Sequence, residues 1–178
     1  MHLNKKYFMK IFLVGMMGAG KSHWAKILSK KLKITYYDLD NLIEILEEQS
    51  VNEIFEKEGE DYFRRVESKI LKWFAEKKSF ILATGGGTAC FNNNISWMNK
   101  TGITLWIKED ENVIIQRLQE DKLLRPAIKS FTNHQIEEFV KQKLSERTQF
   151  YSQSKIHLSP QELNETHIIN CIKNLKES

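Results

Sequence analysis

Residues 15–22 read GMMGAGKS, and they directly follow the apolar run Ile11–Val14. This stretch matches the pattern G-x-x-x-x-G-K-S and predicts a phosphate-binding loop between a buried strand and a helix. In such a loop several backbone N–H groups point into one concavity, and the helix N-terminus adds positive potential. We therefore expect Lys21 to reach the outer phosphates of a nucleotide and the Ser22 hydroxyl to bind Mg²⁺.

Length and composition indicate one globular domain. The chain has 178 residues, of which 41% are hydrophobic and 28% are charged, which is typical of globular proteins. No run of 18 apolar residues occurs, so we expect no membrane-spanning helix. The 27 basic and 23 acidic residues are spread along the chain and give a net charge of +4. This mild positive bias favours anionic small molecules over nucleic acid as partners.

Cysteine usage bears on the cellular compartment. The two cysteines, Cys90 and Cys171, form no C-x-x-C motif, which argues against a disulfide framework or a zinc site and suits a reducing compartment. Lys10 interrupts the apolar stretch near the N-terminus, and no A-x-A-like site follows it, so a secretory signal is not expected. We expect a cytoplasmic protein that is a monomer.

Apolar segments alternate with amphipathic ones along the chain. Short apolar runs predict strands at 11–14, 34–37, 80–83, 103–107 and 156–158, and helical spacing predicts helices near 42–55, 63–74, 109–118, 134–152 and 161–176. Strands that are apolar throughout and alternate with helices are typical of a parallel sheet covered on both faces. We predict a single α/β domain over residues 1–178, because no repeat or linker interrupts the pattern.

Three predicted strands end in polar or glycine-rich segments, at residues 15–22, at Asp38 and Asp40, and at Gly85–Gly87. In an open parallel sheet, ligands bind beyond the carboxyl ends of the strands, so these segments should share one site. If the chain turns into a helix at Asp40, the two carboxylates diverge, and one could order a Mg²⁺ shell while the other meets a second substrate. The alternative is that Asp40 caps a helix beginning near Asn41.

Other features allow both a structural and a functional interpretation. Arg64 and Glu67 form either an exposed helical pair worth a few tenths of a kcal/mol or an arginine fork for a substrate carboxylate. Gly85–Gly87 form either a bare turn or a place where a ligand approaches the backbone. Arg125-Pro126 lies in the polar segment 119–132, which suits a mobile lid carrying a cation to the phosphates or a plain surface loop. Spacing alone assigns no role to the histidines or tryptophans.

Taken together, the motifs resemble the shikimate kinase family across nearly the whole chain. The matching segments are, in order, residues 15–22, Asp38-Leu39-Asp40, Gly59-Glu60 with Phe63-Arg64 and Glu67, Thr84 to Gly87, Arg125-Pro126, and Arg147 with Tyr151. Many nucleotide-binding families share the phosphate loop, whereas the ordered set is specific. The resemblance implies a P-loop fold of the nucleoside-monophosphate-kinase type, with a five-stranded parallel sheet, helices on both faces, a shikimate-binding region at about 38–67 and a lid at about 119–132.

The resemblance also implies an activity and its residues. The activity is Mg²⁺-dependent transfer of a phosphoryl group from ATP to the 3-hydroxyl of shikimate, a step toward the aromatic amino acids. Lys21, Asp40 and Arg125 would be catalytic, Ser22 would bind the metal and Asp38 would support its shell. ATP would contact Gly18, Ala19, Gly20, Lys21, Ser22, His23, Arg117, Arg125 and Pro160. Shikimate would contact Asp40, Arg64, Gly85, Gly86, Gly87 and Arg147, with Glu67 orienting Arg64.

Two positions depart from the family pattern, and other functions remain open. His23 replaces a second hydroxyl residue, and Ala127 stands where a bulkier apolar residue commonly follows the proline. A gluconate kinase would keep the loop and the lid but would have less use for two arginines beside a glycine triplet. A GTP-dependent switch would need an N-K-x-D motif, which is absent. A catalytically silent nucleotide-binding protein is the other alternative, although Lys21, Asp40 and Arg125 together speak against it.

Overall fold

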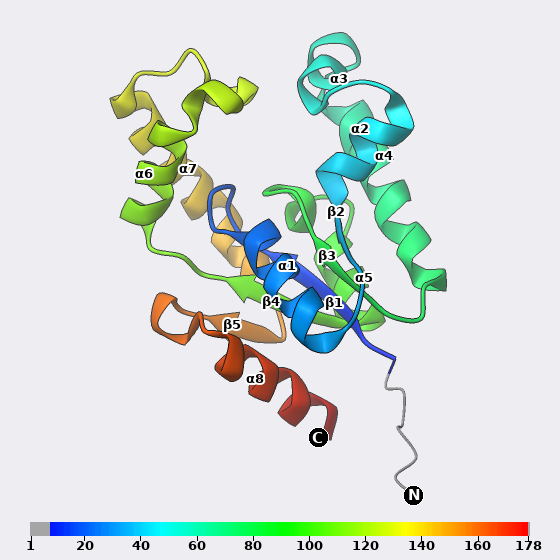
Figure 1. The fold of residues 1–178 in the computed structure, drawn as a ribbon. Helices are drawn as coiled ribbons and strands as arrows, with labels where there is room; N and C mark the ends of the chain where they lie inside the picture. The colour runs from blue at the N-terminus through cyan, green and yellow to red at the C-terminus, as the bar shows by residue number, and fades with distance from the viewer. Residues whose placement is uncertain (1–7, 178) are drawn as a thin grey trace, which may run out of the picture.

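The computed structural model describes residues 8–177, in which five strands form one parallel sheet in the order β2-β3-β1-β4-β5 (Figure 1). The strands are β1 (Lys10–Val14), β2 (Tyr36–Asp38), β3 (Phe80–Ala83), β4 (Ile103–Ile107) and β5 (Ile156–Leu158). The central strand is β1, so the loop that follows it leaves the sheet at its middle. The predicted parallel α/β sheet is confirmed.

Helices cover both faces of the sheet, as predicted (Figure 1). They are α1 (Lys21–Leu32), α2 (Leu39–Glu47), α3 (Val51–Lys57), α4 (Gly59–Trp73), α5 (Asn94–Thr101), α6 (Glu111–Glu120), α7 (Asn133–Tyr151) and α8 (Glu165–Glu177). Successive β1 residues point to opposite faces. Ile11 and Leu13 lie in one buried cluster with residues of α1 and α8, and Phe12 and Val14 lie in a second cluster with residues of α4 and α5. None of the helices in residues 8–177 is long and apolar enough to cross a membrane.

The strands largely match the sequence-based expectation. Those predicted at 80–83, 103–107 and 156–158 coincide with β3, β4 and β5. The second strand is shorter than predicted, and the expectation that it is buried was wrong, because Tyr36 is 39% exposed. The reason is its place at the edge of the sheet, where only β3 pairs with it.

One helical prediction was wrong, and one helix was missed. The helix expected near 42–55 is split into α2 and α3, because Ser50 and Glu53 form a capping box that starts a new helix. Helix α5 was not predicted at all. It follows Asn92 and Asn93, both of which have positive φ angles, and such a polar, turn-forming start masks the short helix behind it.

The segment expected to be a lid contains two short 3-10 turns, η3 (Lys122–Leu124) and η4 (Pro126–Ile128). One side chain of this polar segment packs fully into the core. Ile128 is fully buried in the cluster that includes residues of α6 and α7, whereas Leu123 is 76% exposed. The segment is therefore anchored at its C-terminal end and exposed near its middle.

Candidate active site

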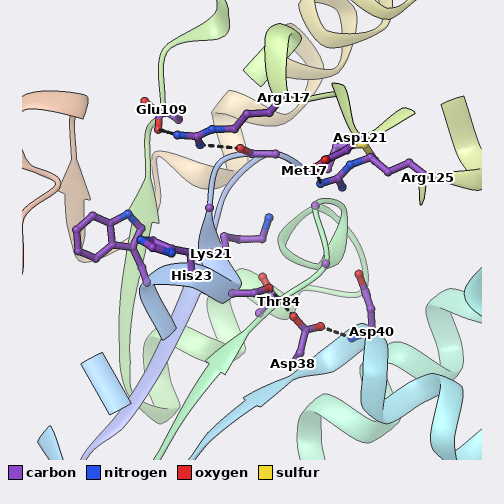
Figure 2. A pocket seen from close by; sticks show the side chains of 16 residues that line it. Met17, Lys21, His23, Asp38, Asp40, Thr84, Glu109, Arg117, Asp121 and Arg125 are labelled. Carbon is purple, nitrogen blue, oxygen red and sulfur yellow. Dashed lines mark hydrogen bonds and ion pairs between the residues drawn. The ribbon is translucent and has the colours of Figure 1, made fainter. Parts of the chain in front are cut away.

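A cavity of about 490 Å³ opens beyond the carboxyl ends of β1, β2 and β3 (Figure 2). Eleven predicted site residues line it: Gly18, Gly20, Lys21, Ser22, His23, Asp38, Asp40, Gly85, Gly86, Arg117 and Arg125. Met17, Trp24, Thr84, Glu109 and Asp121 complete the lining. The predicted residues Ala19, Arg64, Glu67, Gly87, Arg147 and Pro160 do not line the cavity.

Left-handed backbone angles shape the phosphate loop. The φ angles of Gly15, Gly18 and Gly20 are +140°, +79° and +89°, a region that L-residues with side chains rarely adopt. A Cβ at Gly15 would also lie 2.7 Å from the carbonyl oxygen of Ile107. Ala19 has its side chain in the core, and its backbone N–H donates to the carbonyl of Met16 at 3.1 Å. That N–H closes the loop instead of pointing to the cavity.

The ammonium of Lys21 lies in the loop and is nearly buried. Its Nζ donates to the carbonyl oxygens of Gly15 and Met16, both at 2.9 Å. Burial lowers the pKa of Lys21 to about 8, although the carboxylates of Asp40 and Asp38 oppose this shift. A buried cation held only by neutral carbonyls is well prepared to receive an anionic phosphate.

Asp38 and Asp40 have different hydrogen-bond partners, which agrees with the expectation that their carboxylates diverge. The Ser22 hydroxyl donates to Asp38 Oδ2 at 2.5 Å, and Asp38 Oδ1 accepts from the backbone N–H of Asp40 at 3.2 Å. Asp38 is therefore the N-cap of α2, which begins at Leu39. The interpretation of Asp40 as a helix cap is wrong.

The Ser22–Asp38 pair fits a magnesium ion that arrives with a nucleotide. It offers a hydroxyl oxygen and a carboxylate oxygen side by side, and Mg²⁺ prefers one or two carboxylates together with phosphate oxygens and waters. In the part of the chain that the structure describes, no group of three His, Cys, Asp or Glu side chains could hold a metal by itself.

Asp40 faces the cavity from the first turn of α2 (Figure 2). Burial raises the pKa of its carboxyl to about 6, and the nearby carboxylates of Asp38 and Glu67 add to this effect, whereas Lys21 and Arg64 oppose it. No hydrogen bond joins this carboxylate to another described residue. It is free to accept a hydrogen bond from a ligand in the cavity.

Beside the cavity, α4 carries a buried ion pair. Arg64 is 9% exposed and Glu67 is fully buried, so the interpretation of this pair as an exposed one is wrong. Arg64 Nη1 donates to Glu67 Oε2 at 2.9 Å, and its Nε and Nη2 donate to Glu60 Oε1 at 3.2 and 3.1 Å. Glu67 Oε1 also accepts from the Thr88 hydroxyl at 2.5 Å. These hydrogen bonds hold the guanidinium in one orientation. A planar guanidinium held in this way is suited to bind a carboxylate.

The glycine triplet leaves room for three charged side chains. A Cβ at Gly85 would lie 2.8 Å from Asp40 Oδ1, one at Gly86 would lie 3.3 Å from Arg147 Nη1, and one at Gly87 would lie 2.5 Å from Arg64 Nη2. None of the three glycines has a positive φ, so an added side chain would crowd these charged groups rather than strain the backbone. They bring a carboxylate and two guanidinium groups to one short segment.

Arg147 and its neighbour Tyr151 reach this segment from α7. Arg147 Nη1 contacts Met16 Sδ at 3.9 Å, next to the phosphate loop. Tyr151 is fully buried, and its hydroxyl donates to the carbonyl of Gly86. Burial raises the pKa of this hydroxyl, so it remains protonated and keeps this bond. Through this hydrogen bond Tyr151 connects the glycine triplet to α7, the helix that carries Arg147.

Of the three predicted nucleotide contacts outside the phosphate loop, Arg117 and Arg125 line the cavity and Pro160 does not. Arg117 Nη1 donates to the carbonyl of Gly18 at 2.9 Å, and its Nη2 pairs with Glu109 at 3.0 Å. Arg125 pairs with Asp121 at 3.4 Å, and its Nε is buried without a partner. Pro160 begins the turn after β5, outside the cavity lining.

Sequence reasoning missed several residues of the site. Trp24, Glu109 and Asp121 line the cavity, and their spacing gives no signal of this. Thr88 directly follows the glycine triplet, and this position in the sequence could have identified it as part of the site. A buried Asn94 supports it by donating to the Thr88 carbonyl at 3.0 Å.

Comparison with known proteins identifies one family. The family model described as Shikimate kinase matches residues 17–176. A shikimate kinase from Azobacteroides pseudotrichonymphae is 40% identical over 148 residues, which are 83% of this chain and 87% of that protein. The shikimate kinase of Bacteroides thetaiotaomicron is 34% identical over 169 residues, 94% of this chain and 97% of the relative.

Solved structures give the same result. The crystal structure of the Bacteroides thetaiotaomicron shikimate kinase matches with a TM-score of 0.83 and 34% identity, covering 95% of this chain and 97% of that chain. An Acinetobacter baumannii shikimate kinase in complex with shikimate matches with a TM-score of 0.79 and 29% identity, covering 95% and 92%. A gluconokinase from Sinorhizobium meliloti, at 11% identity and a TM-score of 0.55, shares the fold alone. The family-model match and the relatives at 34–40% identity over most of both chains show that this chain belongs to the shikimate kinase family.

Proposed function

We propose that this protein transfers the γ-phosphoryl group of ATP to the 3-hydroxyl of shikimate and forms shikimate 3-phosphate and ADP. The observation that carries the proposal is the shared cavity of Lys21 and Asp40, with Arg64 and Arg147 beside it at the glycine triplet. A phosphate-binding cation and a carboxylate in one cavity suit transfer to a hydroxyl. Two arginines beyond the carboxylate suit an acceptor with a carboxylate of its own.

The nucleotide end of the cavity is assigned to ATP. Backbone N–H groups of the loop around Gly18 and Gly20 would hold its phosphates, and Lys21 would exchange its carbonyl partners for phosphate oxygens. Arg117 and His23 line the same end of the cavity, so they are proposed contacts of the nucleotide. For Ala19 and Pro160 the geometry gives no support beyond the family resemblance.

We assign Mg²⁺ to the Ser22–Asp38 pair. When bound with ATP, the ion would neutralise charge on the phosphate oxygens during transfer. Ser22 supplies the hydroxyl oxygen, and Asp38, whose other oxygen caps α2, is held in place to support the metal shell. The N-cap bond fixes this carboxylate before any ligand arrives.

The acceptor end is assigned to shikimate. Asp40 accepts a hydrogen bond from the attacking hydroxyl and orients its oxygen toward the γ-phosphorus. As the new P–O bond forms and the bond to ADP breaks, the hydroxyl proton passes to the Asp40 carboxylate. Phosphoryl transfer depends chiefly on such positioning and on electrostatic stabilisation. Arg64, oriented by Glu67, and Arg147 bind the acceptor's carboxylate, and the backbone of Gly85–Gly87 lies against its ring.

The segment 119–132 is proposed as the lid that brings Arg125 to the transferring phosphoryl group. Its single ion pair with Asp121 is partly exposed, and such a pair is readily exchanged for a stronger contact with phosphate. We further propose that the protein works as a monomer in the cytoplasm, where Cys90 and Cys171, both free thiols, would stay reduced.

A coupled assay of ADP release tests the proposal. Purified protein is supplied with ATP and with shikimate, gluconate or a nucleoside monophosphate, each with and without Mg²⁺. We expect turnover with shikimate only, and only in the presence of Mg²⁺. Turnover of gluconate with shikimate inert would favour the gluconate kinase alternative, and nucleotide binding without turnover of any acceptor would favour a silent nucleotide-binding protein.

A further inference from the structure

Three phenylalanine rings surround the guanidinium of Arg64. Its central carbon lies 4.3 Å from the ring centroid of Phe91, 5.0 Å from that of Phe63 and 5.9 Å from that of Phe55. Phe63 is 3% exposed, and it packs against Phe55 with 4.7 Å between their centroids, so these two rings build the core under α4. Phe91 is 36% exposed and makes the shortest of the three contacts, and the core does not require it.

The chain folds back to hold Phe91 in this place. After η2 (Thr88–Cys90), the Phe91 carbonyl accepts from the backbone N–H of Asn94 at 2.9 Å. The side chain of Asn92 donates to the backbone carbonyl of Arg64 at 3.0 Å. The missing side chain of Gly87 leaves the space that Arg64 Nη2 occupies. The segment 87–92 therefore contacts Arg64 through Gly87, Phe91 and Asn92.

The edges of the same guanidinium are partly used by carboxylates. Nε, Nη1 and Nη2 each donate one N–H to Glu60 or Glu67. Because a guanidinium has five N–H groups, one remains on Nη1 and one on Nη2. Two donors on neighbouring nitrogens suit one further carboxylate. Arg64 already shares its charge with two glutamates, so an incoming carboxylate gains most if water is kept from the contact and the plane cannot turn.

We propose that Phe91 is a positioning residue for the acceptor's carboxylate and that it acts through Arg64. Its ring covers one face of the guanidinium, restrains the plane through a cation–π contact and keeps water from that face. The two remaining N–H groups then stay directed at the position of the substrate carboxylate. This inference rests on the proposed function, and it names the residue that sets the affinity of Arg64 for its ligand.

Steady-state kinetics of three Phe91 variants test the proposal. Phe91→Ala removes the ring, Phe91→Leu keeps apolar bulk without a π face, and Phe91→Tyr restores the ring. We expect Phe91→Ala to raise the KM for shikimate about 3- to 10-fold, with kcat and the KM for ATP changed less than about 2-fold. Phe91→Leu should resemble Phe91→Ala, and Phe91→Tyr should restore the KM. Trp73→Ala is the control, because Trp73 is a 51% exposed aromatic on the same helix as Arg64 and should change no constant.

A double-mutant cycle shows whether the effect passes through Arg64. The kcat/KM for shikimate, which needs no saturation, is measured for Phe91→Ala in the wild-type and Arg64→Ala backgrounds. The loss caused by Phe91→Ala should nearly vanish once the guanidinium is gone. An equal loss in both backgrounds, or an unchanged shikimate KM in Phe91→Ala, overturns the inference. Neither result affects the proposed function, which fails only if the wild-type protein does not phosphorylate shikimate.

Discussion

The two ends of the cavity use glycine for different physical reasons. At the nucleotide end, Gly18 and Gly20 have positive φ angles and surround a backbone concavity. At the acceptor end, Gly85 and Gly87 have no such angles, and each leaves space for a charged side chain, Asp40 or Arg64. The first end offers a ligand its main chain around Lys21, and the second end offers side chains that packing has brought together.

This difference explains how each end is stabilised. The phosphate loop is a short contiguous segment whose shape follows from its own sequence. The acceptor end depends on a buried network in which Glu67, Thr88 and Asn94 connect α4 to the segment after β3. Side chains of this network are fully buried, and a buried polar group that loses its partner is costly. The acceptor end should therefore be the more sensitive to substitutions that move side chains.

The largest expected effect on kcat is at Asp40, between the nucleotide end and the acceptor end of the cavity. Asp40→Asn should lower kcat at least ~100-fold, the scale expected for loss of a positioned general base, because the amide cannot take the hydroxyl proton. The KM for ATP should change little. Coupled assays measure both constants, with thermal unfolding as a check on folding. Near-normal turnover of this variant would remove Asp40 from the chemistry.

Arg125→Ala should reduce kcat about 100-fold and weaken shikimate binding much less. Arg125 pairs only with a partly exposed Asp121 in this structure, so its main contact is expected with the phosphoryl group in the transition state. Arg65→Ala is a suitable control, because that arginine contacts only the ring of Tyr62 among the contacts described for it. Equal kcat values for the two variants would contradict the role given to the lid.

Arg64→Lys should raise the KM for shikimate about 10-fold and leave the KM for ATP nearly unchanged. Lysine keeps the positive charge but loses the planar donors that hold Glu60 and Glu67. Isothermal titration with shikimate gives the same comparison without turnover. An unaltered affinity for shikimate would mean that a positive charge at position 64 is sufficient for binding and that the planar geometry of the guanidinium is not needed.

Two glycine substitutions separate the two uses of glycine directly. A Cβ at Gly20 would meet no atom closer than 3.7 Å, but its φ is +89°, so Gly20→Ala should cost about 1–2 kcal/mol of stability and raise the KM for ATP. Gly87 has an ordinary φ of −97°. Gly87→Ala should therefore act through the space that the new methyl group takes, and it should raise the KM for shikimate several-fold by displacing Arg64. Thermal unfolding and both KM values measure the contrast. Identical profiles for the two variants would break the comparison.

The smallest expected effect is a change in backbone protection of the lid, measured without any substitution. Hydrogen exchange of the amides of 121–125 and of Ala127 should be fast in the free protein and slow with ADP and shikimate, because none of the side chains described in this range is buried. The amides near Ile128, whose side chain is fully buried, should be protected in both states. Uniform protection across the segment would mean that the lid is already closed.

The sequence alone was sufficient for most of the sheet and for the phosphate loop. The apolar runs 80–83, 103–107 and 156–158 became strands with those bounds, because buried parallel strands require continuous apolar residues. The loop at 15–22 was recognisable because its chemistry is local: the glycines, Lys21 and Ser22 are neighbours in sequence as well as in space. Strong local signals of this kind do not depend on the rest of the chain.

Only the tertiary structure decided the alternatives at the acceptor end. Whether Asp40 capped a helix depended on where α2 begins, and whether Arg64 and Glu67 were exposed depended on the packing of α4 against the segment after β3. The place of Phe91 over Arg64 depended on a turn at two asparagines with positive φ. Apart from the start of α2 at Asp38, these contacts join residues that are far apart in sequence, and side-chain spacing along one helix or strand carries no information about what packs against it.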